Sequence, residues 1–179
     1  IILIPYSNGK ATFDKRTTVA DTEGKFEFNA LSTDNESTYV VSVNFQDADY
    51  ASREITLSST NASQAIELEV YDSTTSDENI QVSNGHMVVY VDQGDLHVEE
   101  IWRFSNIGDK TFIGTQGKAA GMTLRFTLPS GATSLLADTG SPVETTGTGA
   151  ASTVAVPPGI TDINFSYFFP YQGSSMTIT

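Results

Sequence analysis

The feature that most constrains this chain is the spacing of its apolar residues. They recur at every second position, in runs of about five to eight residues rich in Val, Ile, Thr, Phe and Tyr, and Gly, Asp, Asn or Pro separates the runs. This alternation is typical of half-buried β-strands, whereas the 3.6-residue period of an amphipathic helix is almost absent. Many short strands spaced about ten residues apart favour antiparallel sandwiches. The sequence therefore predicts an all-β protein made of antiparallel β-sandwiches.

The same pattern predicts where the chain divides. The predicted strands are residues 1–5, 11–19, 25–28, 38–45, 51–57, 65–71, 80–91, 95–105, 111–114, 122–128, 133–136, 152–156, 161–168 and 175–179. The segment YDSTTSDEN, residues 71–79, is polar and acidic, as linkers are. We therefore expect two tandem domains, residues 1–71 and 80–179, joined by a linker at 72–79. Residues 138–152, DTGSPVETTGTGAAS, are small and polar and are predicted to form a loop.

Composition limits the compartment and the partners. With 22 acidic and 9 basic residues the net charge is −13, which repels nucleic acid and anionic membrane surfaces. Only 17% of residues are charged, and Ser, Thr, Asn and Gly replace them, which favours an extracellular, secreted or cell-surface protein. The chain lacks cysteine and any apolar run of the ~18–20 residues that a membrane helix needs, so we expect no disulfide and no direct membrane insertion of this segment. It opens on IILIPY without a signal peptide, and we expect it to be the interior of a longer precursor.

The acidic turns are the candidates for a metal site. In TTVADTEGKFEFNAL, Asp21 is placed to accept backbone hydrogen bonds, Gly24 suits a positive φ, and two Phe residues follow at alternate positions. This favours a turn before a strand that faces the core. Calcium needs about six oxygen ligands, and the sequence offers Asp21 and Glu23 here and Asp47 and Asp49 in a later turn. Calcium binding by these four residues is the alternative to solvated turns.

The first unit has a resemblance beyond its alternation. A strand ends in Thr, an Asp-x-x-Gly turn follows, and an aromatic–x–aromatic strand and a Tyr-led alternating strand come next. This order resembles the carboxypeptidase regulatory-like family of transthyretin-type (prealbumin-like) sandwich domains. The matching positions are Thr18, Asp21, Gly24, Phe26, Phe28, Leu31, Tyr39, Val41, Val43, Tyr50 and Ser52. The resemblance covers about residues 1–70, implies a stalk or accessory module and brings no catalytic residue.

The family's usual first strand, with its G-x-V signature, has no counterpart in this chain. We therefore expect the first sandwich to lack one strand, which leaves a groove flanked by unpaired backbone groups. Such an edge is a template for a strand from another subunit.

The second unit is similar to an uncharacterised β-sandwich of bacterial surface proteins. Its clearest element is VVYVDQGDLHVEEIWRF, residues 88–104, two alternating runs around a turn, which predicts a hairpin. Its register places His97 near Tyr90 and away from His86, so the two histidines are predicted to be ordinary surface or edge residues. Leu96, Val98, Trp102 and Phe104 share one face, with Glu100 as the exception. Tyr167 and Phe169 are predicted to be core residues.

No motif of a nucleophile, a metalloprotease or a phosphate loop occurs in the sequence, and we expect no enzymatic activity. Three N-x-S sequons, at Asn35, Asn61 and Asn164, have the form of glycosylation acceptors. They are used only in an organism that glycosylates secreted proteins.

Two functions remain open from the sequence. The first is a non-catalytic structural or adhesive protein of the cell surface that self-associates into a filament or array through its β-strand edges. The second is an accessory module of a secreted enzyme that binds carbohydrate or peptide. The second predicts an exposed aromatic strip, for which Tyr90, Trp102, Tyr167 and Tyr171 are the candidates.

Overall fold

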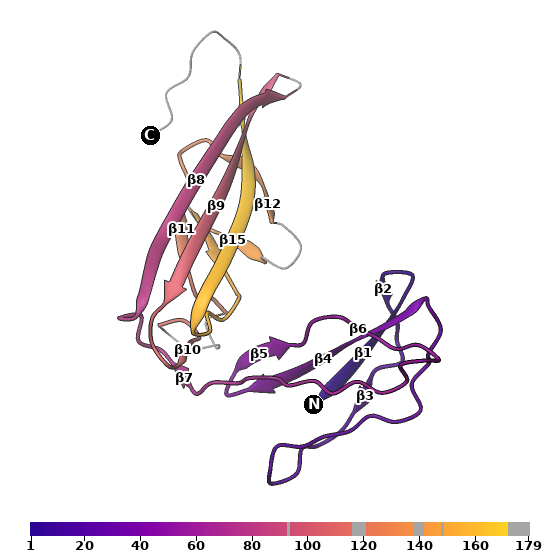
Figure 1. The fold of residues 1–179 in the computed structure, drawn as a ribbon. Helices are drawn as coiled ribbons and strands as arrows, with labels where there is room; N and C mark the ends of the chain where they lie inside the picture. The colour runs from indigo at the N-terminus through magenta and orange to yellow at the C-terminus, as the bar shows by residue number, and fades with distance from the viewer. Residues whose placement is uncertain (93, 116–120, 138–141, 148, 172–179) are drawn as a thin grey trace. The chain divides into compact units, whose positions relative to one another are not determined.

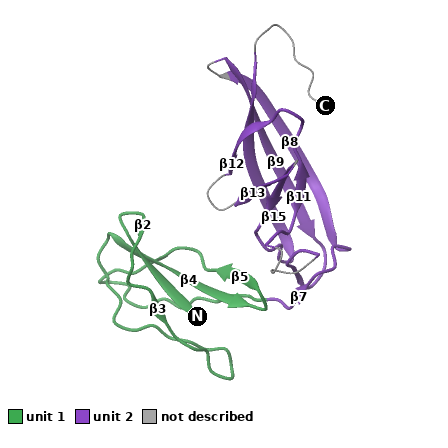
Figure 2. Ribbon diagram, turned by 180° about the vertical axis from the view of Figure 1, so that it is seen from behind, with its two compact units in different colours: residues 1–70 green, residues 71–179 purple. Residues whose placement is uncertain are grey.

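The computed structural model describes residues 1–92, 94–115, 121–137, 142–147 and 149–171, and this part of the chain contains strands and no helix. The all-β class predicted from the alternation is therefore confirmed. The chain divides into two compact units, residues 1–70 and 71–179 (Figures 1 and 2). The strand predicted at 175–179 lies outside the described residues.

Unit 1 contains one antiparallel sheet, ordered β2-β1-β4-β5, in which β3 also pairs with β1 and β6 with β4. Its strands are β1 (Ile2–Ser7), β2 (Lys10–Ala11), β3 (Arg16–Thr17), β4 (Ser37–Phe45), β5 (Ala48–Ala51) and β6 (Ile55–Thr56). β1 and β4 form its centre, because they pair from Ile2–Ser42 to Ser7–Ser37. The buried core is Leu3, Tyr39, Val41, Ile55 and Leu57.

Two strands predicted in unit 1 do not form. Residues 25–28 and 65–70 belong to no sheet of the described chain, although their side chains alternate between half-buried and exposed. The strand predicted at 11–19 is reduced to the two-residue strands β2 and β3. The physical reason is that alternation reports only which side chains face the core, whereas a strand also needs a neighbouring backbone to pair with.

The described residues of unit 2 form three sheets. They are ordered β12-β15-β9-β8, β11-β14-β13 and β10-β7, and only the last is parallel. The strands are β7 (Ser73–Thr74), β8 (Ile80–Asp92), β9 (Asp95–Asn106), β10 (Thr111–Phe112), β11 (Arg125–Thr127), β12 (Thr133–Ala137), β13 (Val143–Thr146), β14 (Gly149–Ser152) and β15 (Gly159–Pro170). Two residues of the segment predicted as a linker therefore form β7, which pairs with β10.

The predicted hairpin is confirmed as β8 and β9. Its pairing and that of β9 with β15 are the longest among the described residues. Its register places Tyr90 opposite His97, as expected, and shifts once between Val82 and Asn84. The turn uses Gly94 at φ +92°, a conformation that glycine adopts without strain.

The core of unit 2 lies on one face of β9 and β15. Tyr167 and Phe169 are buried there, which confirms their predicted place in the core. Phe126 of β11 packs against this face, with its ring centroid 6.0 Å from Phe104 and 4.9 Å from Phe165. The three-stranded sheet therefore covers the middle of the four-stranded one.

The prediction of a loop at 138–152 is wrong for Val143–Thr146 and Gly149–Ser152, which form β13 and β14. All four residues of β14 are buried. A Cβ atom at Gly149 would lie 2.2 Å from the carbonyl oxygen of Phe126, so the small residues reflect close packing of backbones and not a surface loop. The strand predicted at 152–156 is likewise reduced to the end of β14 and an isolated bridge between Val156 and Phe112.

Candidate functional site

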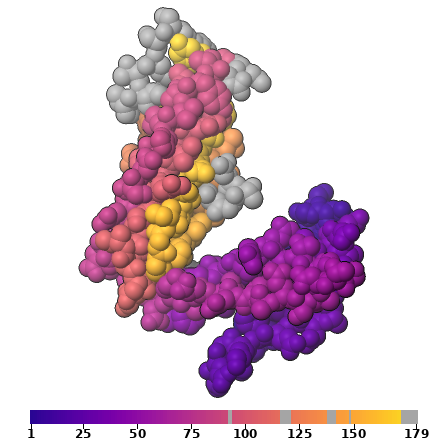
Figure 3. Space-filling view, in the orientation of Figure 1, coloured from indigo at the N-terminus to yellow at the C-terminus, as the bar shows by residue number. Residues whose placement is uncertain are grey.

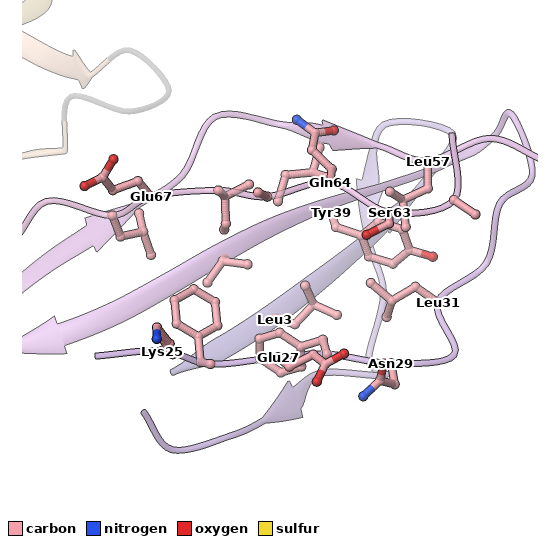
Figure 4. A pocket seen from close by; sticks show the side chains of 18 of the residues that line it. Leu3, Lys25, Glu27, Asn29, Leu31, Tyr39, Leu57, Ser63, Gln64 and Glu67 are labelled. Carbon is pink, nitrogen blue, oxygen red and sulfur yellow. The ribbon is translucent and has the colours of Figure 1, made fainter. Parts of the chain in front are cut away.

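An open groove of about 700 Å³ lies in unit 1 (Figure 4). Its floor is apolar and belongs to the core of the unit. The floor residues are Leu3 on β1, Tyr39 and Val41 on β4, Ile55 on β6, and Leu57. A volume of this size matches the ligand sites of proteins, and here it opens directly onto a hydrophobic core.

Two strand-like segments form the sides of the groove. One is residues 23–31, which contributes the half-buried Phe26 and Phe28, and the other is residues 62–68, which contributes Ile66 and Leu68. Figure 4 shows Leu3 and Tyr39 between the segment that carries Glu27 and the segment that carries Gln64. The core of unit 1 is therefore flanked by two segments, and the groove lies between them.

A stretch of backbone on each side lacks hydrogen-bond partners. Residues 26–28 and 62–70 make no backbone hydrogen bond within the described chain. Further along the first side, the carbonyl groups of Asn29 and Ala30 accept hydrogen bonds from Arg16 at 2.7 and 3.3 Å. Segments that alternate like strands, yet have free N–H and C=O groups, are open edges.

The rim of the groove is acidic. Glu23, Glu27 and Glu67 border it with exposed side chains, and Lys25 is the lysine among its lining residues. Lys25 already pairs with Glu23. The uncompensated charge at the rim is therefore negative.

Unit 2 has an edge of another kind, strand β8. It is thirteen residues long and lies at the end of its sheet, next to β9. Residues 80–91 include no Asp, Glu, Lys or Arg. Long edge strands usually carry such charges, because a charge opposes pairing with a second chain.

Apolar side chains of β8 are exposed on both faces of the sheet. Val82, Met87, Val89 and Val91 lie opposite core residues of β9, yet they are 57%, 55%, 46% and 58% exposed. Val88, on the other face, is also exposed. The space-filling view shows β8, in magenta, at the surface of unit 2 (Figure 3). The covering sheet therefore does not reach this edge.

An aromatic row crosses the face of the four-stranded sheet that points away from the core. The paired residues Tyr90, His97 and Phe168 form it, with ring centroids 4.7 Å apart for the first pair and 4.3 Å for the second. The ring of His97 is stacked on Phe168, and its Nε2 atom is buried without a hydrogen-bond partner in the described structure. The hydroxyl of Tyr90 donates to Glu99 Oε1 at 2.9 Å.

The other aromatic candidates do not join this row. Tyr167 is buried in the core. Trp102 is half-buried on the core face, and its ring occupies the space that a Cβ atom at Gly85 would need, 2.7 Å from Cζ3. Tyr171 packs against the core cluster. The sequence missed His97 and Phe168 as members of the row, because the signal for them is the pairing of β9 with β15, which is non-local.

A buried carboxylate, Glu100, explains the exception noted on the apolar face of β9. It is 6% exposed and accepts hydrogen bonds from the Tyr167 hydroxyl at 2.6 Å and from Trp102 Nε1 at 2.7 Å. Burial and, second, the hydrogen bond to Glu100 raise the pKa of Tyr167 above its ordinary value of 10.0. Two neutral donors satisfy this carboxylate, so it links β9 to β15 inside the core.

The acidic turns of unit 1 serve the backbone. Asp21 Oδ1 accepts hydrogen bonds from the N–H groups of Glu23 at 2.8 Å and Lys25 at 2.9 Å, and Gly24 has φ +80°. Asp47 lies in a two-residue hairpin turn with φ +68°, and Asp49 accepts a hydrogen bond from Asn44. Among the described residues, no three His, Asp or Glu side chains converge as a metal site requires.

The remaining candidates lie at separate places. Asn35 and Asn61 are exposed residues outside the strands of unit 1, whereas Asn164 is half-buried on β15 with its Oδ1 atom buried. His86 is exposed on β8, and its ring lies 3.0 Å from the side-chain amide of Asn84. His86 and His97 are not neighbours, because His86 lies opposite Ile101 and His97 lies opposite Tyr90.

The described residues contain no helix long and apolar enough to cross a membrane. A comparison of the chain with protein-family models, with curated proteins and with solved structures found no match.

Proposed function

We propose that this chain is a non-catalytic structural or adhesive protein of the cell surface, made of two tandem β-sandwich domains, that self-associates through exposed strand edges. The first of these domains, in this proposal, is of the carboxypeptidase regulatory-like type. The observation that carries the proposal is β8, a long edge strand with exposed apolar side chains and no charged residue from 80 to 91. An edge of this kind pairs readily with another strand.

The low charge of β8 supports self-association in particular. The whole chain carries −13, so two copies repel each other over most of their surfaces. Residues 80–91 themselves carry none of this charge. Two β8 strands running antiparallel would join two four-stranded sheets into one and cover Met87 and Val89 of each copy.

The test is a charge placed on the edge. Sedimentation velocity of the full chain over a range of concentrations, with negative-stain electron microscopy, measures association. We expect Val88→Lys to weaken association about tenfold or more, because a lysine on an edge strand opposes its pairing with a second strand. The matched control is Val19→Lys, which places the same charge on an exposed valine of unit 1. A protein that stays monomeric at every concentration, or a Val88→Lys variant that associates like the wild type, would overturn the proposal.

The second candidate function, an accessory module that binds carbohydrate, is favoured by one observation, the row of Tyr90, His97 and Phe168. Aromatic rings on an open sheet face can pack against the C–H groups of a sugar. We expect Phe168→Ala to abolish any glycan binding measured by calorimetry, while Val19→Lys, in unit 1, leaves it in place. Binding that survives Phe168→Ala would remove this candidate.

A further inference from the structure

The groove of unit 1 is a second open site, and its sides indicate what it binds. Residues 26–28 on one side and 62–70 on the other have unpaired backbone groups. A small molecule would leave most of these groups without partners, whereas an extended peptide brings an N–H or C=O group at every residue. The backbone of the groove therefore favours a β-strand as its occupant.

The floor of the groove determines one face of that strand. Leu3, Tyr39 and Val41 are buried, while Phe26 and Ile66 on the sides are only half-buried. Apolar side chains at alternate positions of the incoming strand would complete this core, at about 25 cal/mol for each Å² of apolar surface removed from water. The inward positions of the strand are therefore apolar.

The rim determines the other face. Glu23, Glu27 and Glu67 border the groove, and Lys25 is already paired with Glu23. Since charge complementarity selects partners and suppresses like-charged ones, the outward positions of the strand carry Lys or Arg.

We propose that the groove of unit 1 binds a β-strand of another polypeptide chain, apolar at alternate positions and basic on its outward face, between residues 23–31 and 62–68. This goes beyond the proposed function, which rests on β8 in the other unit, because it names the chemistry of a partner for a separate site.

Three synthetic peptides test the inference on the full chain. The first is Thr-Val-Lys-Val-Lys-Val-Thr, the second has Glu in place of Lys, and the third has Pro in place of the central Val. We expect the Lys peptide to bind at least about tenfold more tightly than the Glu peptide, and the Pro peptide not to bind, because Pro removes a backbone donor and fixes φ. Calorimetry measures the affinities, and hydrogen exchange locates the site by slowed exchange at residues 26–28 and 62–70.

Rim variants test the charge. Glu67→Lys is expected to reduce the preference for the Lys peptide by about tenfold, whereas Glu78→Lys, an exposed acid of unit 2, is expected to leave it unchanged. Equal affinity for the Lys and Glu peptides, or no binding of any peptide, would overturn the inference. Slowed exchange at residues 80–92 in place of the groove would also overturn it and would support assembly through β8. A Val88→Lys variant that no longer self-associates but still binds the Lys peptide would support the inference, because peptide binding would then not depend on β8.

Discussion

The two units differ in how far their strands are paired, although the same alternation runs through both. In unit 2, β9 is paired along its length on both sides, by β8 and β15, and Phe126 packs on the core face of both β9 and β15. In unit 1, β1 and β4 are well paired, but the two segments over their core face, residues 23–31 and 62–68, belong to no sheet of the described chain. One unit has a closed core and an exposed edge, and the other has an open core.

This difference shows that burial and pairing are separate requirements. The side chains of Phe26 and Phe28 pack against the core of unit 1, as those of strand residues would, and their ring centroids lie 6.2 Å apart. Their backbone nevertheless contributes no sheet hydrogen bonds. A core whose sides are held by side-chain contacts alone is the part of a protein where local opening costs least.

The two cores are expected to differ most in the free energy of unfolding that each loses when a Phe ring is removed. We expect Phe165→Ala to lower the free energy of unfolding of unit 2 by about 3–5 kcal/mol, because it empties a closed core. Phe26→Ala, in the side of the groove, is expected to cost unit 1 about 1 kcal/mol, because the ring is already partly in water. Trp102, the single tryptophan, reports urea unfolding of unit 2, and hydrogen exchange of β1 and β4 reports unit 1. Equal losses would mean that the groove is closed in solution.

The next largest effect tests the polar link inside the closed core. Glu100→Ala leaves the Tyr167 hydroxyl and the Trp102 indole N–H buried without an acceptor, so we expect a loss of about 2–4 kcal/mol in the free energy of unfolding of unit 2. The neighbouring Glu99→Ala, on the opposite face of β9, is the matched control and is expected to cost about 0.5 kcal/mol. A Glu100→Ala variant as stable as the Glu99→Ala variant would show that these hydrogen bonds do not hold β9 to β15.

The same link predicts a dependence on alkaline pH. The pKa of Tyr167 is raised in the folded state, so above pH 10.0 the unfolded phenol loses its proton while the folded one keeps it. The unfolded state then binds fewer protons, and the stability of unit 2 falls as the pH rises above that value. We expect Tyr167→Phe to remove this part of the decline when urea unfolding is followed by Trp102 fluorescence at pH 9 to 11. Tyr6→Phe, in unit 1, should keep the wild-type slope, and an unchanged slope in Tyr167→Phe would contradict the prediction.

The smallest effect concerns the acidic turn at the groove end of unit 1. Asp21→Ala removes the acceptor of two backbone hydrogen bonds at an exposed site, so we expect a loss of about 0.5–1.5 kcal/mol in the stability of unit 1. Glu23→Ala is the control and should change the stability by about 0.5 kcal/mol or less. Melting curves recorded with calcium and with a chelator are expected to share one midpoint. A midpoint raised by calcium and restored by Asp21→Ala would assign these acids to a metal site.

Much of the fold could be predicted from local pattern. The hairpin of β8 and β9 follows from two alternating runs around a turn that contains Gly94, and both its register and its core face were predicted. The turn at Asp21 follows from the short range of its carboxylate, which reaches N–H groups two and four residues on. Contacts of this kind join residues near in sequence, so the sequence contains their whole cause.

The candidate sites depend on contacts that are distant in sequence. The aromatic row needs Phe168 beside His97, and β13 and β14 need close approach of Gly149 to Phe126; neither is visible in a local pattern. The exposure of Val82 and Met87 depends on where the covering sheet ends. Sequence reasoning identified these residues as apolar and could not say which of them the rest of the chain would cover.

By itself, then, the sequence determined the all-β class, the β8–β9 hairpin and which residues of β9 and β15 face the core of unit 2. Tertiary structure alone decided that residues 26–28 and 65–68, alternating like strands, would line an open groove and remain outside any sheet of the described chain. It also decided that β8 would be an edge. The reason is that the period of a strand is a property of its own side chains, whereas pairing needs a second backbone, which only the folded chain or a partner supplies.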